Sequence, residues 1–269
     1  MPELPEVQTV LDTLRYQIKD CKITDINVIY KPIVNCDLKE FNKLIGQHFR
    51  DFRRRGKYLL FIMDDVVLVS HLRMEGKYYL MDPEEPLSRH MHVIFSLDNG
   101  KQLRYNDVRK FGRMELYPLD YDFNHFKNLG PEPFDDSFNH EYVKQYFSRM
   151  KKPLKEVLLD QSFVAGCGNI YADEVCSAIE IRPDTPVNKL NDEDIDRLIE
   201  AVRNILNEAI KAGGTTIRSY TSSLGVSGRF QLSLRVHTLD KCPKCGSDII
   251  KIRIGGRGTY YCPLCQKER

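Results

Sequence analysis

The chain has 269 residues, an apolar fraction of 42% and a formal net charge of +2, which is ordinary for a globular protein and long enough for two domains. No apolar run approaches membrane-spanning length and the start lacks the charged and apolar regions of a signal peptide, so we expect a soluble intracellular protein with no membrane partner. The charge is uneven, because residues 226–269 carry nine Lys and Arg against three Asp and Glu, and this basic segment predicts an anionic partner.

The first expected element is an amphipathic helix close to the chain start. Its apolar positions recur at steps of three and four residues: Leu4, Val7, Leu11, Leu14 and Ile18. A docked helix would anchor Pro2, and removal of Met1 would give Pro2 a free secondary amine beside Glu3 and Glu6. Such an amine can act as a nucleophile with a carboxylate as its proton-transfer partner. The alternative is an ordinary helix start, where acids are favoured by the helix dipole.

The next hundred residues have the pattern of short antiparallel strands. Apolar residues alternate from Ile26 to Tyr30, and two hairpins are expected where turn residues separate apolar runs. The first hairpin is expected to join the strands Tyr58–Met63 and Val66–Val69, and the second to join Met91–Leu97 and Lys101–Tyr105. One further strand is expected at Arg113–Tyr117. Several short strands at close spacing predict a β-sandwich.

Prolines and glycines interrupt regular structure after residue 118, and we place a domain boundary there. The expected segments are an N-terminal domain over 1–118, a linker over 119–136, a helical domain over 137–225 and a C-terminal module over 226–269. Helices are expected at 138–150, 153–160, 170–179 and about 192–212. Asn191 and Asp194 can cap the last helix, and residues 215–229, which are rich in Gly, Ser and Thr, are expected to form a mobile loop.

Basic residues gather just before the first hairpin: Arg50, Arg53, Arg54, Arg55 and Lys57. A cluster of this kind is ordinarily a solvated face. Lys57 differs from the others because Gly56 precedes it and an apolar run follows. This position would place Lys57 at the mouth of a strand.

Two segments between strands have the character of protruding tips, 71–76 and 106–112. Exposed Met74 and Phe111 would be unusual there unless they insert into something, and apolar wedges enter the base stack in DNA-bending proteins. Arg109 could hydrogen-bond a base edge. Taken alone, Met74 or Phe111 is more ordinarily a core side chain at a strand end.

A Gly-x-Gly-Asn turn, Gly166 to Asn169, stands directly before the expected helix at 170–179. Backbone N–H groups at a helix start bind phosphate, and Asn169 could touch that phosphate. Helix capping by Asn169 is the alternative.

Four of the eight cysteines form a metal-binding pattern. The pair Cys242-x2-Cys245 is followed, after sixteen residues, by Cys262-x2-Cys265. This spacing is a zinc signature, and four thiolates leave no open position, so we expect one structural Zn²⁺ without which the module does not fold. The other four are expected to be ordinary buried thiols: Cys21, Cys36, Cys167 and Cys176.

Between the cysteine pairs, Arg257 stands among three glycines at the tip of an expected hairpin that begins with Lys251. A glycine-rich tip can approach a phosphate closely, and arginine can grip it with two hydrogen bonds. A solvated basic hairpin is the alternative.

These motifs occur together, in order, in one family. They are Pro-Glu-Leu-Pro-Glu, His-Leu-Arg-Met, Asp-Val-Arg-Lys-Phe-Gly, Gly-Asn-Ile-Tyr-Ala-Asp-Glu and Gly-Arg-Gly-Thr. With the zinc spacing, they closely resemble bacterial formamidopyrimidine-DNA glycosylase (Fpg, MutM) over the whole chain. The resemblance implies an α+β fold, with an N-terminal β-sandwich, a helix–two-turns–helix domain, a C-terminal zinc finger and DNA in the cleft between.

The resemblance also implies a function. The protein would be a monomeric cytoplasmic bacterial enzyme, associated with the nucleoid through DNA, that acts in base excision repair. It would excise oxidised purines such as 8-oxoguanine and formamidopyrimidines from double-stranded DNA. It would then cleave the strand by β,δ-elimination, as a lyase at the abasic site.

The same resemblance assigns roles to residues. Pro2 would be the nucleophile, Glu3 the general acid/base and Glu6 a support for the terminus, while Lys155 matches a family lysine linked to handling of the oxidised base. The residues expected to hold phosphates are Lys57, His71, Asn169, Lys251 and Arg257. Lys57 and Arg257 are also expected to be catalytic residues, together with Pro2 and Glu3. The residues expected to fill the gap left by the extruded base are Met74, Arg109 and Phe111. The loop at 218–228 would close over that base.

The sequence departs from the family pattern at two places. Cys167 replaces the usual aliphatic residue of the Gly-x-Gly turn, and residues 236–239 lack the typical Tyr-Gly-Arg.

Two other functions remain open. An endonuclease VIII-type glycosylase for oxidised pyrimidines shares several motifs, although Leu4 and the Arg109-x-Phe111 tip favour the purine enzyme. A non-catalytic zinc-ribbon DNA-binding protein would explain the basic tail but gives Pro2 no role.

Overall fold

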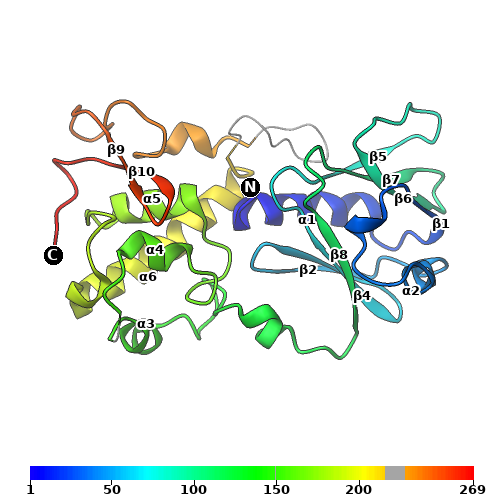
Figure 1. Ribbon diagram of the computed structural model, residues 1–269, viewed down its shortest axis with the longest axis horizontal. Coiled ribbons are helices and arrows are strands. Elements are labelled where there is room, and N and C mark those ends of the chain that lie inside the picture. Colours follow the sequence, from blue (N-terminus) through cyan, green and yellow to red (C-terminus); the bar gives the residue numbers. More distant parts are fainter. Residues whose placement is uncertain (149, 216–227) are drawn as a thin grey trace. The chain divides into compact units, whose positions relative to one another are not determined.

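The computed structural model describes residues 1–148, 150–215 and 228–269. It divides the chain into two compact units. The first comprises 1–123 with 213–215 and 228, and the second comprises the described parts of 124–212 together with 229–269. The boundary between 123 and 124 lies within residues 119–136. Each unit is described by itself below (Figure 1).

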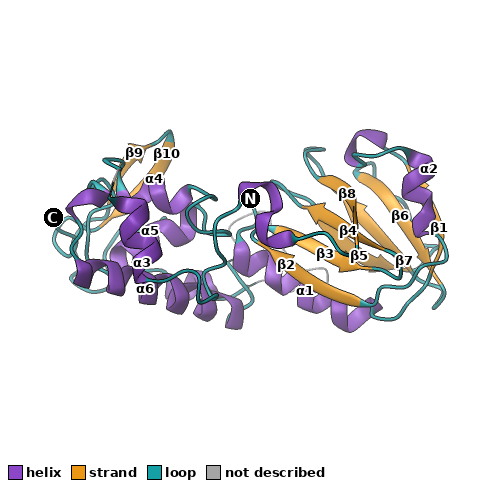
Figure 2. Ribbon diagram, turned by 90° about the horizontal axis from the view of Figure 1, so that it is seen from below, coloured by secondary structure: helices purple, strands orange, loops and turns teal. Residues whose placement is uncertain are grey.

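The first unit is a β-sandwich of two antiparallel four-stranded sheets. One sheet has the order β1-β6-β7-β5 and the other β2-β3-β4-β8 (Figure 2). The strands are β1 Ile23–Val28, β2 Asp51–Arg55, β3 Tyr58–Ile62, β4 Val66–His71, β5 Lys77–Met81, β6 Met91–Leu97, β7 Gln102–Asn106 and β8 Arg113–Pro118. Short helices connect them: α2 Leu38–Phe41, η1 Lys31–Ile33 and η2 Asn42–Leu44.

Helix α1, Leu4–Ile18, packs against β2 and β3 and closes the core of the sandwich. The buried stripe predicted from the sequence is confirmed, with Val10 added to it. These aliphatic side chains contact a cluster of aromatic rings from the sheets, in which Phe49, Phe52 and Phe61 lie 5.7–6.1 Å apart. Burying one such side chain contributes about 1.5–3 kcal/mol, so this face holds the chain start against the sandwich.

Both predicted hairpins are confirmed, and two strands were not predicted. The missed strands, β2 and β5, are each one of the two outer strands of their sheet, while the other outer strands, β8 and β1, were predicted. Edge strands carry charged residues because one side faces solvent. The Arg-rich sequence of β2 therefore has the pattern of a surface cluster rather than of a strand.

The second unit combines helices with a C-terminal hairpin. Helix α5 packs against α4, α6 and β10, so it lies at the centre of this unit. The elements that belong to it are α3 His140–Phe147, α4 Leu154–Leu159, α5 Asn169–Ala178, η4 Val187–Lys189, α6 Asp192–Lys211, η5 Phe230–Ser233, β9 Ile250–Ile254 and β10 Arg257–Tyr261, while η3 Phe123–Asn128 begins at the boundary. The predicted capping box of α6 is confirmed, since Asn191 Oδ1 accepts a hydrogen bond from Asp194 N at 2.8 Å.

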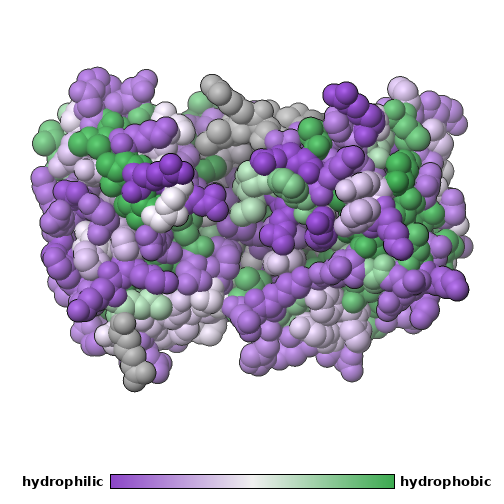
Figure 3. Space-filling view, viewed as in Figure 1, coloured by the Kyte–Doolittle hydropathy of each residue, from purple (hydrophilic) through white to green (hydrophobic). Residues whose placement is uncertain are grey.

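Within the described residues, no helix combines the length and hydrophobicity that crossing a membrane requires. Hydrophilic side chains cover most of the face seen in Figure 3.

Candidate functional site

The start of the chain is anchored rather than frayed. Pro2 and Glu3 are buried, and Glu3 is the N-cap of α1 with extended backbone angles. The backbone N–H of Glu3 donates a 2.8 Å hydrogen bond to Glu6 Oε2. This bond and the buried Leu4 side chain hold the first residues in one conformation.

The second oxygen of Glu6 is bound by a residue that sequence reasoning missed. Thr215, just after Gly213-Gly214, donates its backbone N–H at 2.8 Å and its hydroxyl at 2.9 Å to Glu6 Oε1. The Glu6 carboxylate therefore accepts three hydrogen bonds and joins the chain start to a segment 209 positions away. A supporting role for Glu6 at the terminus stays a prediction.

The surroundings favour the neutral form of an amine at the chain start. Burial is the largest effect on the Met1 amine, and it lowers the pKa below its usual 8.0. Glu3 and Glu6 raise this pKa, while Lys57 lowers it. Burial outweighs the opposing charges, so this environment lowers the pKa of an amine at the chain start and favours its reactive form.

Lys57 and His71 lie together near the chain start, on the sheet containing β2, β3 and β4. Lys57 is 5% exposed and follows Gly56, whose φ of +54° makes the turn between β2 and β3. Tyr58 pairs with His71 across β3 and β4, and their rings are 4.4 Å apart. The backbone N–H of Arg73 donates to His71 Nδ1 at 2.9 Å, which places the proton of a neutral imidazole on Nε2.

The four arginines of the basic cluster make hydrogen bonds that stabilise the first unit. Each arginine donates hydrogen bonds within the first unit: Arg50 to Asp64, Arg53 to Asp51, Arg54 to Gln8 and Gly56, and Arg55 to the carbonyl of Phe123. These four side chains are committed to structure.

The three expected gap-filling residues are exposed. Met74 is 37% and Phe111 47% exposed, so neither is a core side chain at a strand end. The Arg109 guanidinium lies 4.9 Å from the centre of the Phe111 ring. Leaving large apolar side chains in water at two neighbouring tips is unfavourable in free energy. Such exposure therefore indicates a contact surface.

Asp107 fixes the conformation of the second tip. Its carboxylate is wholly buried and accepts the backbone N–H groups of Arg109, at 3.0 Å, and Gly112, at 2.8 Å. The Tyr105 hydroxyl fills the space beside the glycines of both tips, because a Cβ at Gly76 or Gly112 would lie 2.3 or 1.7 Å from it. The two tips thus share one buried support.

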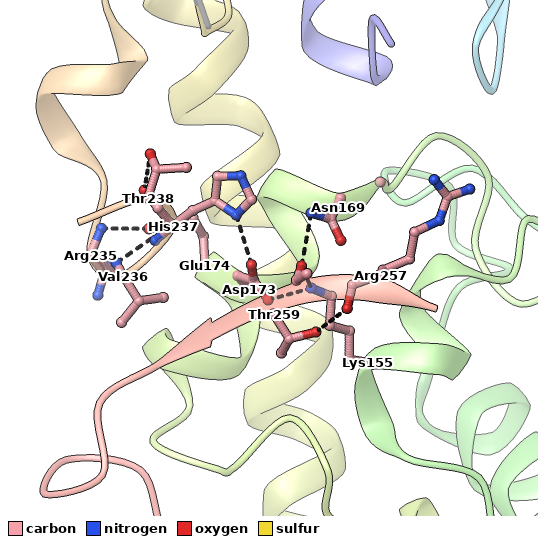
Figure 4. Close-up of polar contacts among 12 residues, drawn as sticks. Lys155, Asn169, Asp173, Glu174, Arg235, Val236, His237, Thr238, Arg257 and Thr259 are labelled. Carbon is pink, nitrogen blue, oxygen red and sulfur yellow. Dashed lines mark hydrogen bonds and ion pairs between the residues drawn. The ribbon is translucent and has the colours of Figure 1, made fainter. Parts of the chain in front are cut away.

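In the second unit, three of the predicted residues converge on β10. Asn169 Nδ2 and Lys155 Nζ both donate to the carbonyl of Gly258, at 3.1 and 2.9 Å (Figure 4). Arg257 precedes that glycine and is exposed. Lys251, on β9, lies 5.2 Å from the Tyr260 ring centre.

The four cysteines predicted to bind zinc form a cluster. Their sulfur atoms all lie within 4.8 Å of one another, with Cys242 and Cys265 3.9 Å apart and Cys245 and Cys262 3.5 Å apart. Tetrahedral zinc with Zn–S bonds of about 2.3 Å requires sulfur atoms about 3.8 Å apart, so the cluster fits a zinc ion. Of the other four cysteines, two are buried and two are half-buried: Cys167 and Cys176, and Cys21 and Cys36.

The predicted loop at 218–228 lies outside the described residues except for Gly228. Within the first unit, the Met1 amine is close enough to Glu6 and Lys57 for their charges to shift its pKa, and the two tips share the Tyr105 support. Within the second, the structure brings together Lys155, Asn169, Arg257 and the zinc cluster.

Three family descriptions match the chain. They are the formamidopyrimidine-DNA glycosylase N-terminal domain over residues 1–114, the H2TH domain of the same enzyme over 129–221, and a zinc finger found in FPG and IleRS over 240–267.

Individual relatives match over their full length. Proteins named formamidopyrimidine-DNA glycosylase from Oceanobacillus iheyensis and Bacillus subtilis are 46% and 44% identical, and each alignment covers 100% of this chain and 99% or 100% of the relative. Two solved structures of Lactococcus lactis Fpg, one with DNA containing N7-benzyl-Fapy-dG and one with abasic-site DNA, match with a TM-score of 0.93. They are 41% and 42% identical and cover 99% of this chain and 100% of theirs. The chain therefore belongs to the formamidopyrimidine-DNA glycosylase family and is a DNA glycosylase of base excision repair.

Proposed function

We propose that this protein excises oxidised purines from double-stranded DNA through a Schiff base on Pro2 and then cleaves the strand at the abasic site. The observation that carries the proposal is the anchored, buried chain start, where Glu6 accepts the backbone N–H of Glu3 and burial lowers the pKa of the Met1 amine. The relatives support a bacterial enzyme that acts on DNA. We further propose that it works as a cytoplasmic monomer.

The chemistry follows from a neutral secondary amine. The lone pair of Pro2 nitrogen forms a bond to the sugar C1′, and the base leaves with the electrons of the glycosidic bond and takes up a proton. Opening of the sugar ring then gives an iminium ion, which resembles the Schiff bases that lysine amines form in other enzymes. The iminium acidifies neighbouring sugar protons, so elimination breaks the phosphodiester bonds on both sides, with Glu3 carrying protons as general acid/base.

Access to C1′ requires that the nucleotide be turned out of the duplex, which costs a few kcal/mol. Met74, Arg109 and Phe111 are proposed to occupy the vacated space and so to offset this cost. The proposed phosphate contacts come from both units: Lys57, His71, Asn169, Lys251 and Arg257. One structural Zn²⁺, held by the four cysteines, would keep the hairpin that carries Arg257 rigid.

Substrate class is tested by comparing single-turnover excision from duplexes that contain 8-oxoguanine or thymine glycol. We expect faster excision of 8-oxoguanine. Preference for thymine glycol would instead assign the protein to the endonuclease VIII type, with the same Pro2 chemistry.

The contact between Glu6 and the segment at Thr215 can be tested through Gly214. Its φ is +79°, and a Cβ there would lie 2.9 Å from Glu6 Oε1. Gly100 has a φ of +80° with nothing within 4 Å of its Cβ position, so Gly100→Ala is a matched control for backbone strain.

We expect both alanine variants to lose about 1–2 kcal/mol of stability from the left-handed backbone. Only Gly214→Ala should also slow formation of a borohydride-trapped adduct, by up to about 100-fold, because it displaces the carboxylate that anchors the chain start. Equal trapping rates in the two variants would exclude this role for Glu6.

The lowered amine pKa predicts the pH dependence of trapping. We propose that burial acts in the same direction on the Pro2 amine, which is left when Met1 is removed, as it does on the Met1 amine. The neutral amine reacts, so the rate should rise with pH through the amine pKa and level off above it, with a midpoint below the usual 8.0. Lys57→Met removes a charge that lowers this pKa and should move the midpoint upward. Lys101→Met, at an exposed lysine paired with Asp82, is the control. A wild-type midpoint at or above 8.0 would contradict the assignment.

A further inference from the structure

Lys155 is expected from the family resemblance to handle the oxidised base, yet its side chain is wholly buried. None of it is exposed, and its ammonium group donates to Asp173 Oδ1 at 2.7 Å and to the Gly258 carbonyl at 2.9 Å. A buried ammonium is costly unless it is paired and hydrogen-bonded, and Asp173, also 0% exposed, meets that requirement. The side chain therefore faces the interior of the second unit.

Hydrogen bonds link the Lys155–Asp173 ion pair to the segment that precedes the zinc finger. Asp173 Oδ2 lies 2.7 Å from His237 Nδ1, and Glu174 accepts the backbone N–H groups of residues 235, 236 and 237 at 2.7–3.1 Å (Figure 4). The His237 ring packs edge-on against Tyr260 of β10, with ring centres 5.1 Å apart. His237 thereby contacts both Asp173 and Tyr260.

On its other side, the Lys155–Asp173 ion pair contacts the β9–β10 hairpin, which is proposed to bind phosphate. The Gly258 carbonyl accepts from both Lys155 and Asn169. Arg257 is the neighbouring residue, and its side chain points away from the buried cluster in Figure 4. Thr259, 0% exposed, donates its hydroxyl to the Arg257 carbonyl at 3.1 Å. The backbone on both sides of Gly258 is thereby held from the buried side while the guanidinium is presented outward.

We propose that Lys155 and Asp173 are positioning residues that hold Arg257 and Asn169 for phosphate contact, and that Lys155 does not touch the damaged base. The inference rests on the proposed function only in taking Arg257 and Asn169 as phosphate contacts. A positioning role acts equally on every duplex that these two residues grip, whereas a base contact acts only where a base is present.

The test compares two probes, an 8-oxoguanine duplex and a duplex with a tetrahydrofuran abasic analogue, which has no base to contact. Binding is measured over a series of salt concentrations for wild type, Lys155→Met and Arg257→Ala. We expect Lys155→Met to weaken binding of both duplexes by the same factor, about 10–100-fold, and to reduce the salt slope by about 0.9 for each phosphate that the protein no longer neutralises, as Arg257→Ala does. A weakening confined to the 8-oxoguanine duplex would overturn the proposal.

A double variant separates positioning from a general effect on stability. Lys155→Met combined with Arg257→Ala should bind little worse than Lys155→Met alone, because Lys155→Met already removes the phosphate contact of Arg257. Fully additive effects would contradict the proposal. Lys189→Met removes the same charge from an exposed lysine of the second unit and should leave binding nearly unchanged.

Zinc content and melting temperature are measured for each variant. If Lys155→Met does not fold, Asp173→Asn, which keeps the shape of the side chain but weakens its hold on the ammonium group, replaces it in the same comparisons with the same expected results. Binding to the abasic analogue needs no chemistry at Pro2, so the test gives its answer even if Pro2 is not the nucleophile.

Discussion

Loss of the zinc ion should abolish tight binding to duplex DNA. The buried cluster of the zinc module contains Val236, Cys242 and Cys262, so two of its three buried residues are themselves proposed ligands. Apparent binding free energies of structural zinc in finger peptides are about 10–16 kcal/mol, far more than so small a cluster supplies. Without zinc, the hairpin that presents Lys251 and Arg257 should not hold its conformation.

Cys265→Ala tests this expectation against Cys36→Ala, since both cysteines are half-buried. We expect Cys265→Ala to lose zinc and to bind the abasic-analogue duplex at least about tenfold more weakly for each charged side chain that no longer reaches a phosphate. Cys36→Ala should keep both zinc and affinity. Full affinity in a zinc-free Cys265→Ala protein would show that the metal does not support the DNA-binding surface.

Changing the Pro2 amine should have the largest effect on the chemistry. Pro2→Gly replaces the secondary amine by a primary amine on a flexible residue, and an N-terminal extension removes the free amine altogether. The extension should abolish the borohydride-trapped adduct, because it removes the proposed nucleophile, and Pro2→Gly should strongly slow the adduct, because the primary amine that it leaves is no longer held in place by the proline ring. The rate is measured in single turnover on an 8-oxoguanine duplex.

Glu3→Gln provides a graded comparison with these variants. It keeps the amine and the shape of the side chain but removes the proton-transfer group, which contributes about 10²–10⁴-fold in enzymes of this kind. We expect a slowed adduct rather than none. Unchanged affinity of all these variants for the abasic-analogue duplex would show that the effects lie in chemistry. Normal trapping by the extended protein would remove Pro2 from its role, and a non-catalytic DNA-binding protein would give no adduct even with the native terminus.

Periodic segments were predictable from the sequence because their signal is local. The apolar stripe of α1, the capping box of α6 and the Asp98-Asn99-Gly100 turn between β6 and β7 each lie within a few residues of chain. The edge strand β2 was missed because its Arg-rich sequence lacks the apolar pattern of a buried strand. Strand β5 was also missed, although four of its five residues, Tyr78 to Met81, are apolar or aromatic.

The sequence motifs suggested candidate site residues, but not the groups that hold them. Glu6 is bound by Thr215, 209 positions away, and Lys155 binds Gly258, 103 positions away. No local pattern marks such partners, since only the folded chain brings them together. The exposure of Met74 and Phe111 could likewise not be decided from the sequence of either tip alone, because exposure depends on how the folded chain packs around each side chain.

The most direct measurement is the location of the reduced adduct. After borohydride trapping on an 8-oxoguanine duplex, nuclease and protease digestion followed by mass spectrometry identifies the peptide that carries the sugar remnant. The account predicts a peptide that begins at Pro2, without Met1, with the remnant on its terminal nitrogen. A remnant on the side chain of Lys57 or Lys155, with Pro2 unmodified, would contradict it.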